Sequence, residues 1–263
     1  MENLHDVRDS KLAQVIPARK VDIIVDIQNR VLSGEWGPGS QLPSERELAA
    51  EYGVSRPVIR EALAGLVELG FIEIHPGRGS YVRGVRTDDL SGSLNRAATL
   101  TKITARDLVA ARLGLECTAV ELAAKESPSP VDAIQRALIE HSEARTIQSL
   151  ADTDLAFHET IVAASGNPLL VLMFGAIRTQ VHALMLRSHS DNLVRQEGDP
   201  YHEKIAQAIS DGKPTLASQL MREHLTLALS LYGSDLDRPI FDVVESRGLR
   251  FASMLRPLET NNR

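Results

Sequence analysis

The stretch between Gln41 and Val82 constrains this chain most, because signals for helix starts, helix ends and turns follow one another closely there. Ser44 is a favourable N-cap, and Glu47 three residues later completes a capping box, so a helix is predicted to begin here. Gly53 can end that helix in the left-handed conformation that glycine tolerates best. Ser55 is then placed to cap a second helix. The spacing predicts two short helices joined by a tight turn.

The second predicted helix has an apolar face and a basic face. Its apolar residues recur at helical spacing and are expected in a core: Val58, Ile59, Ala62, Leu63, Leu66 and Leu69. Arg56 and Arg60 lie four residues apart on another face. Residues 71–74 and 80–82 are typical of strands, and the glycine-rich residues 75–79 are typical of the turn between them. Helix, turn, helix and basic hairpin together predict a winged helix-turn-helix.

The polar residues of this stretch suit contact with DNA. A recognition helix enters the major groove through its N-terminal turns, and Ser55, Arg56 and Arg60 lie early in the second helix. An arginine fork can pair with a guanine edge through two hydrogen bonds. Residues that suit phosphate or minor-groove contact are Ser44, Arg46 and Arg78. The alternative is that the arginines only solvate a helix face, which leaves the coincidence of cap, turn and wing signals unexplained.

One segment resembles the DNA-binding domain of the GntR family of bacterial transcription regulators: LPSERELAAEYGVSRPVIREALAGLVELGFI, followed by GRGSYV. The resemblance extends from Pro17 to about Arg86. It implies that six positions contact DNA as the corresponding family positions do: Ser44, Arg46, Ser55, Arg56, Arg60 and Gly77. The dipeptide His75-Pro76 departs from the family's regular wing, so its role there stays open.

The rest of the chain is predicted to be mainly α-helical. A chain of 263 residues has room for a second core, and an aromatic content of 4% favours helices over a β-sandwich. The helix that supports the winged domain is expected at Arg19 to Ser33, with these residues inward: Val21, Ile24, Ile27 and Val31. The predicted domain organisation is a flexible arm at 1–16, the winged domain at 17–86, a polar linker at 87–103, an all-helical effector-binding and dimerisation domain at 104–233, and a C-terminal extension at 234–263.

The second domain is predicted to be an antiparallel bundle of about six helices. The helical patterns, separated by proline and glycine, cover residues 104–125, 131–146, 149–164, 168–189, 192–210 and 214–232. A further helix is expected around residues 240–255. The single cysteine, Cys117, is expected to be a buried thiol in a reducing cytoplasm. No run of 18 apolar residues and no signal-peptide core is present, so a soluble cytoplasmic protein is expected.

The net charge of −6 is unevenly distributed along the chain. Residues 54–86 hold five arginines and three acidic residues, whereas residues 87–263 hold 18 basic and 23 acidic residues. The positive field is therefore local to the winged domain, and the acidic overall charge does not argue against DNA binding.

Four polar residues interrupt the apolar faces of three helices in the predicted bundle: Asp154, His158, His202 and His224. A carboxylate on an apolar face is costly unless it is paired or binds a metal. One aspartate and three histidines suit a first-row divalent ion such as Zn²⁺, Ni²⁺, Mn²⁺ or Fe²⁺. The alternative is that these are core histidines with ordinary hydrogen-bond partners. Three further histidines are expected to be surface or packing residues: His141, His182 and His189.

A second resemblance covers about Thr104 to Tyr232. Arg112 and Glu116, the run Asp154-Leu-Ala-Phe-His158, the run Ser165-Gly-Asn-Pro-Leu169, His202 and His224 resemble the FCD effector domain of the FadR subgroup of GntR regulators. The resemblance implies a metal held by one Asp and three His, with zinc the first choice, and a small organic acid or sugar acid as effector.

Arg112 is expected to bind the effector, because it shares a helix face with Leu108 and Leu115 and its guanidinium suits a carboxylate. The alternative is an internal salt bridge to Glu116 or Asp154. The combined prediction is a homodimeric repressor that binds a near-palindromic operator and responds to an acid. Its rivals are a metal-dependent enzyme of the His₃Asp type fused to a DNA-binding module, and an architectural DNA binder with a structural metal.

Overall fold

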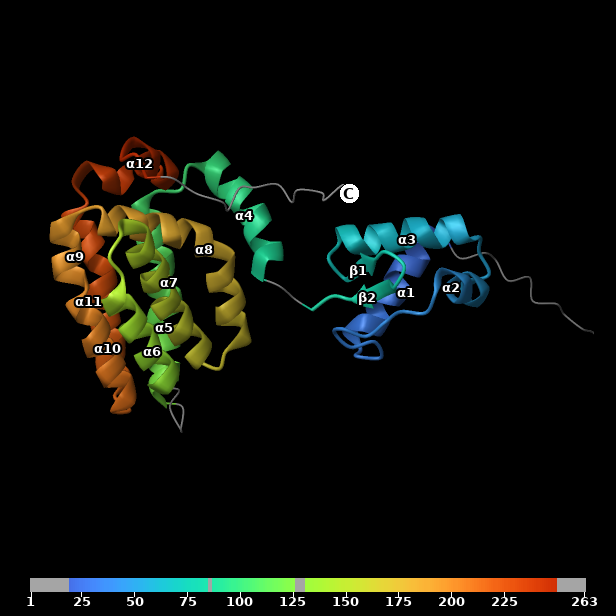
Figure 1. Ribbon diagram of the computed structural model, residues 1–263, viewed down its shortest axis with the longest axis horizontal. Helices are drawn as coiled ribbons and strands as arrows, with labels where there is room; N and C mark the ends of the chain where they lie inside the picture. Colours follow the sequence, from blue (N-terminus) through green and yellow to red (C-terminus); the bar gives the residue numbers. More distant parts are fainter. Residues whose placement is uncertain (1–18, 85–86, 126–130, 250–263) are drawn as a thin grey trace, which may run out of the picture. The chain divides into compact units, whose positions relative to one another are not determined.

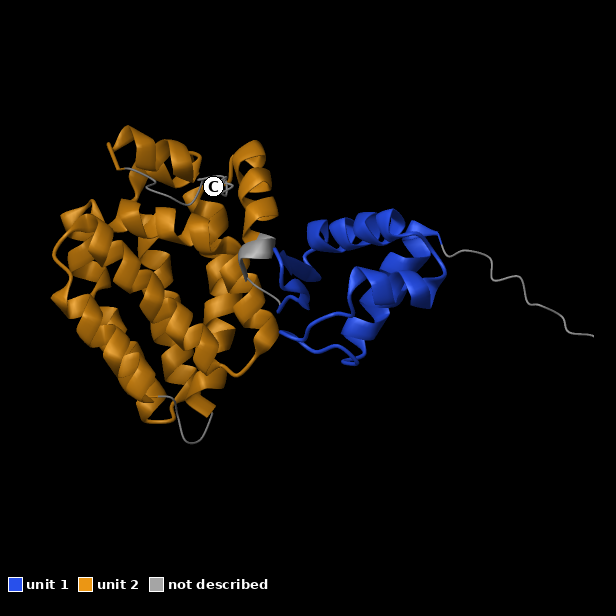
Figure 2. Cartoon of the chain, turned by 45° about the vertical axis from the view of Figure 1, so that its right-hand side comes forward, with its two compact units in different colours: residues 1–86 blue, residues 87–263 orange. Residues whose placement is uncertain are grey.

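The computed structural model describes residues 19–84, 87–125 and 131–249 (Figure 1). It confirms the prediction of a mainly α protein with an N-terminal winged helix-turn-helix and a helical bundle. The chain divides into two compact units, residues 1–86 and residues 87–263 (Figure 2). The arm expected at 1–16 lies outside the described residues, as does the part of the C-terminal extension beyond residue 249.

Unit 1 contains three helices and a hairpin among its described residues: α1 (Lys20–Leu32), α2 (Glu45–Tyr52), α3 (Arg56–Glu68), β1 (Ile72–His75) and β2 (Gly79–Val82). Ser44 caps α2 in the predicted capping box with Glu47, and Gly53 ends it at a φ of 66°. The two strands pair antiparallel, with Ile72 opposite Val82. A hydrophobic core between the helices and the hairpin stabilises the unit.

Two apolar residues of unit 1 lie elsewhere than predicted. Val21 is 65% exposed and Leu69 is 57% exposed, whereas Ile23 and Ile27 are fully buried. Val21 lies in the first turn of α1, and Leu69 is the C-cap residue of α3. Val21 lies off the helix face formed by Ile23 and Ile27, and Leu69 lies just after the end of α3, so neither packs into the core.

Unit 2 is helical in its described residues: α4 (Thr87–Thr101), α5 (Ala105–Lys125), α6 (Val131–Glu143), α7 (Ile147–Ala164), α8 (Pro168–His189), α9 (Asn192–Gly198), α10 (Pro200–Ser210), α11 (Pro214–Leu231), the 3₁₀ turn η1 (Gly233–Asp237) and α12 (Ile240–Ser246). The helix α5 packs against α11 and α7, and α7 packs against α8 (Figure 1). Cys117 on α5 is buried, as expected.

Two predicted boundaries in unit 2 are wrong. Residues 87–103 are not a linker, because most of them form α4, which packs on α8. Asn95 lies buried there and hydrogen-bonds Thr179 at 3.2 Å and Gln180 at 2.9 Å, so a polar residue faces the core with its partners supplied by another helix. The helix predicted at 192–210 is divided into α9 and α10, because Pro200 has no N–H and starts a new helix.

The helix α8 is apolar and long enough to cross a membrane, alone in this among the described residues. Its most apolar window is 56% buried inside the protein. It packs against α4, α7 and α12, which is the position of a core helix in a bundle.

Candidate functional site

A groove in unit 1 lies between the start of α2, the start of α3 and the wing. It is lined by six of the seven residues predicted to contact DNA: Ser44, Arg46, Arg56, Arg60, Gly77 and Arg78. The seventh, Ser55, is exposed at the N-cap of α3, and its side chain makes no cap hydrogen bond. Its hydroxyl can therefore donate to a DNA phosphate, or donate to or accept from a base edge.

Gly77 lies at the tip of the wing with a φ of 72°. A Cβ built at this position would meet nothing within 4 Å, so the space in front of the backbone is open. A phosphate can approach this N–H closely, and most other residues would be strained at this φ.

Glu45 was not predicted as a site residue, and it binds the two arginines at the start of α3. Its carboxylate accepts from Arg56 Nη2 at 3.2 Å and from Arg60 Nε at 2.9 Å. Burial tends to raise the pKa of Glu45, but the hydrogen bonds from Arg60 and Arg56 outweigh burial and lower it. Acidic residues are common in the first turn of any helix, so this position carries no distinctive sequence signal.

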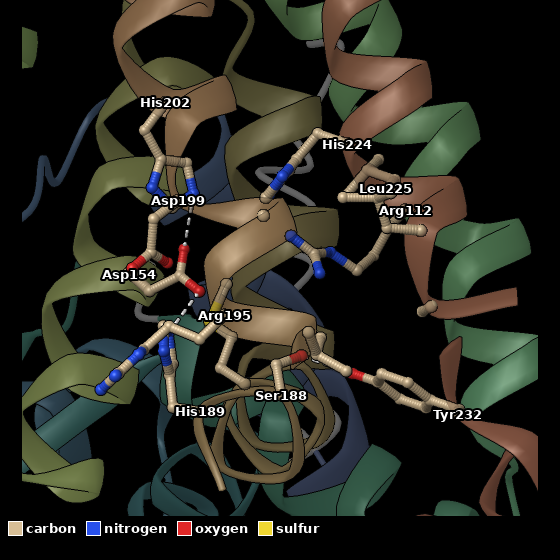
Figure 3. A pocket seen from close by; sticks show the side chains of 15 residues that line it. Arg112, Asp154, Ser188, His189, Arg195, Asp199, His202, His224, Leu225 and Tyr232 are labelled. Carbon is tan, nitrogen blue, oxygen red and sulfur yellow. Dashed lines mark hydrogen bonds and ion pairs between the residues drawn. The ribbon is translucent and has the colours of Figure 1, made fainter. Parts of the chain in front are cut away.

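In unit 2 the structure brings together the four residues that were considered as metal ligands. Asp154 and His158 come from α7, His202 from α10 and His224 from α11, and one ligand atom from each lies within 4.8 Å of the others. Figure 3 shows Asp154, His202 and His224 of this group. His158 Nε2 lies 3.3 Å and His202 Nε2 lies 3.2 Å from Asp154 Oδ1. The ring centroids of His224 and His158 are 5.3 Å apart.

The converging atoms fit a divalent ion better than they fit one another. Four of them are buried and have no hydrogen-bond partner within the part of the chain that the structure describes: Asp154 Oδ1, His158 Nε2, His202 Nε2 and His224 Nδ1. Two ligand atoms bound to one Zn²⁺ at about 2.1 Å lie about 3.0–3.4 Å apart, which matches the distances to Asp154 Oδ1. A buried polar atom left without a partner costs about 1–3 kcal/mol, and a shared cation would remove that cost.

Three of the four residues have pKa shifts that favour the forms that bind a metal, whereas the pKa of His158 is raised because the charge of Glu116 outweighs burial. Burial lowers the pKa of His202, and burial together with the neighbouring imidazoles holds the pKa of His224 well below its usual range. Burial tends to raise the pKa of Asp154, but His202 and the other histidines outweigh it, and the pKa falls well below its usual range. Neutral imidazoles and an ionised carboxylate are the forms that bind a first-row cation.

A buried ion pair supports the cluster from α5. Arg112 Nε donates to Glu116 Oε1 at 2.5 Å, and His158 Nδ1 contacts Glu116 Oε2. Burial tends to raise the pKa of Glu116, but Arg112 and His158 lower it to about 2. Burial tends to lower the pKa of His158, but the negative charge of Glu116 raises it. The internal salt bridge, which was the alternative to effector binding by Arg112, is therefore present, and Glu116 orients the His158 ring.

Arg112 also lines a cavity next to the cluster, so the salt bridge does not remove it from the site. The cavity has a volume of about 40 Å³, and its lining includes Asp154, Ser188, His224 and Tyr232 (Figure 3). A water molecule needs roughly 10–15 Å³ of such space, so the cavity accepts a few water-sized groups. Ser188 and Tyr232 were not singled out from the sequence, since neither interrupts an apolar face.

The three histidines that were expected to be surface or packing residues are all buried. His141, His182 and His189 are 7%, 5% and 4% exposed. His189 Nε2 lies 3.0 Å from Asp154 Oδ2, the oxygen that points away from the other histidines, so it holds this carboxylate in place. His182 and His189 are not at the surface because the second half of α8 is buried on most of its faces, and His141 lies on the buried face of α6 with Ile134 and Ala137.

Comparisons with known proteins agree with both units. Residues 20–82 match the family model "Bacterial regulatory proteins, gntR family", and residues 107–227 match the FCD domain. The regulator LutR of Bacillus subtilis is 30% identical over 205 residues, which cover 74% of this chain and 93% of that protein. The repressor NanR of Edwardsiella tarda is 29% identical over 218 residues, which cover 76% of this chain and 80% of that protein.

A solved structure agrees as well. The GntR protein of Streptococcus agalactiae is 25% identical with a TM-score of 0.62, and the match covers 80% of this chain and 98% of that one. LutR and NanR are named as transcriptional regulators and not as enzymes. The groove of unit 1, whose lining includes arginines, agrees with a protein that binds DNA. With a gntR-type winged domain at residues 20–82 and an FCD domain at residues 107–227, this chain belongs to the GntR family of bacterial transcription regulators.

Proposed function

We propose that the chain is a cytoplasmic, homodimeric repressor that a small organic acid or sugar acid releases from its operator. The observation that carries this proposal is one cavity in unit 2, where Asp154, His202 and His224 present unpaired ligand atoms and Arg112 presents a guanidinium. The name of the relative NanR, a transcriptional repressor, supports the direction of regulation.

DNA recognition would use the groove of unit 1. Base edges in the major groove would be contacted by Ser55, Arg56 and Arg60. The backbone or the minor groove would be contacted by Ser44, Arg46, Gly77 and Arg78. Glu45 would hold the two arginine forks in the groove before DNA arrives, which reduces the side-chain entropy lost on binding.

One first-row divalent ion would be held by Asp154, His158, His202 and His224, with Zn²⁺ the first choice and Ni²⁺, Mn²⁺ or Fe²⁺ as alternatives. When bound, it would offer open coordination positions to a carboxylate oxygen or water. Glu116 would keep the His158 ring oriented, and His189 would keep the Asp154 carboxylate oriented.

The effector would be small and acidic. The cavity of about 40 Å³ accepts a few non-hydrogen atoms without rearrangement, so a larger acid would have to move α9 or α11 to enter. Arg112 would share its charge between Glu116 and the effector carboxylate. The effector can change DNA affinity only as far as it binds the two arrangements of the protein unequally, and DNA must change effector affinity by the same factor.

Elemental analysis of untagged protein purified without chelators tests the metal part of this proposal. We expect about one tightly bound first-row ion per chain, lost in Asp154→Asn. The matched control is His182→Gln, since His182 is also a buried histidine but bonds Asp152 outside the cluster. Protein that carries no metal above background would contradict the proposal.

A thermal-shift screen of small organic and sugar acids, followed by operator titrations, tests the effector part. An acid that stabilises the protein and is recovered unchanged would exclude the metal-dependent enzyme. Release of the operator by that acid would exclude an architectural DNA binder with a structural metal.

A further inference from the structure

A second group of metal-ligating side chains lies beside the first. His141 on α6, His189 at the end of α8 and Asp199 between α9 and α10 each offer one ligand atom within 4.8 Å of the others. The ring centroids of His141 and His189 are 5.6 Å apart. None of these three residues belongs to the four-residue cluster around Asp154.

The hydrogen bonds of His141 leave the lone pair of Nε2 free. Its Nδ1 lies 2.9 Å from Thr153 Oγ1, and that hydroxyl already donates to the carbonyl oxygen of Ser149 at 2.8 Å. Thr153 can therefore only accept from His141, which makes Nδ1 the protonated nitrogen. Nε2 is then an acceptor, and it is buried without a hydrogen-bond partner.

His189 also has one nitrogen without a partner. Its Nε2 contacts Asp154 Oδ2 at 3.0 Å. Its Nδ1 is buried and has no hydrogen-bond partner among the described residues. Two imidazole nitrogens, His141 Nε2 and His189 Nδ1, thus lack partners on side chains that are more than nine-tenths buried.

Asp199 completes the set from the solvent side. Its Oδ1 lies 3.8 Å from His141 Nε2, and its side chain is 39% exposed. It lines both the cavity of the first cluster and a neighbouring hollow that contains His141 and Glu203. Arg145 and Arg195 offset the acidic residues of this hollow, so any attraction for a cation must come from the three ligand atoms rather than from net charge.

We propose that His141 Nε2, His189 Nδ1 and Asp199 form a second divalent-cation site, separate from the four-residue cluster. Two imidazoles and one carboxylate suit Zn²⁺, Co²⁺, Ni²⁺ or Fe²⁺, and three protein ligands leave positions for water or a carboxylate. The ion binds more weakly than at a four-ligand site. It links α6, α8 and the α9–α10 junction at the edge of the effector cavity, and His189 joins it to Asp154.

Titration of untagged, chelator-treated full-length protein with Zn²⁺ and with Co²⁺ tests this site. We expect two ions per chain, a tight one followed by a weaker one, with a change in the visible absorption of Co²⁺ at each step. His141→Gln and Asp199→Asn should each remove the second step and keep the first. His182→Gln should keep both, because His182 bonds Asp152 away from this set. Since Asp199 is partly exposed, Asp199→Asn tests the site even where His141→Gln does not fold.

The two sites fail in distinguishable ways. In His224→Gln, the step that depends on Asp199 should remain although the tight step is lost. Saturation at one ion per chain, or a second step that survives both His141→Gln and Asp199→Asn, would overturn the second site and leave the first one standing.

Discussion

Glu116→Gln is the substitution whose consequences the structure specifies most closely. Glu116 is fully buried, and its carboxylate bonds both the guanidinium of Arg112 and the His158 ring. Glutamine keeps the shape but removes the charge, so Arg112 becomes a buried cation without its counter-ion. Breaking a buried ion pair by removing one partner costs about 3–5 kcal/mol.

The pKa of Glu116 supports a similar magnitude. It falls from an ordinary value of 4.5 to about 2 in the folded protein, and this difference corresponds to roughly 3 kcal/mol of stability. Because the folded pKa is the lower one, this contribution is fully present above pH 4.5 and is lost as the pH falls toward 2. We therefore expect Glu116→Gln to lower the free energy of unfolding by about 3 kcal/mol at both pH 7 and pH 5.

Urea denaturation of metal-free protein at these two pH values measures the effect, with Glu121→Gln on the same helix as a control. Glu121 is only partly buried, and its substitution should cost less than about 0.5 kcal/mol. Glu116→Gln should also weaken metal binding by about 10- to 100-fold, because His158 loses the group that orients it. A stability loss below about 1 kcal/mol, or unchanged metal affinity, would refute this account of the ion pair.

Three further predictions concern DNA binding and its control. Arg56→Ala and Arg60→Ala should each cost about 1–3 kcal/mol of DNA-binding free energy and relax base preference at particular operator positions. Arg46→Ala and Arg78→Ala should weaken binding to all DNA sequences evenly and reduce its salt dependence. Titrations against operator variants at several salt concentrations distinguish these outcomes. Sedimentation should show a homodimer at micromolar concentration, and a monomer that still binds operator tightly would contradict the near-palindromic site. Arg112→Ala should weaken effector binding and the release of the operator by the effector, while leaving DNA binding without effector nearly unchanged. Paired effector titrations with and without operator measure this. Coupling that survives intact in Arg112→Ala would remove this residue from the effector site.

Local sequence signals predicted almost the whole winged domain. The Ser44 capping box, the glycine stop at Gly53 and the hairpin turn are interactions within a few residues, so they can be read without knowing the fold. Local patterns also identified three of the inward polar groups of the bundle, since Asp154, His158 and His202 interrupt apolar faces with helical spacing.

The surroundings of these groups depend on the tertiary structure. Residues 87–103 were predicted to be a linker because residues 83–95 are polar, contain glycine and serine and have few apolar residues. The partners that Asn95 meets in the core, Thr179 and Gln180, lie more than 80 positions away. The spacing of Glu116 predicts its salt bridge with Arg112, but its contact with His158 and that of His189 with Asp154 exist only because α5 and α8 pack against α7. Caps and turns depend on neighbours in the chain, whereas the partners of a buried charge depend on how distant helices pack.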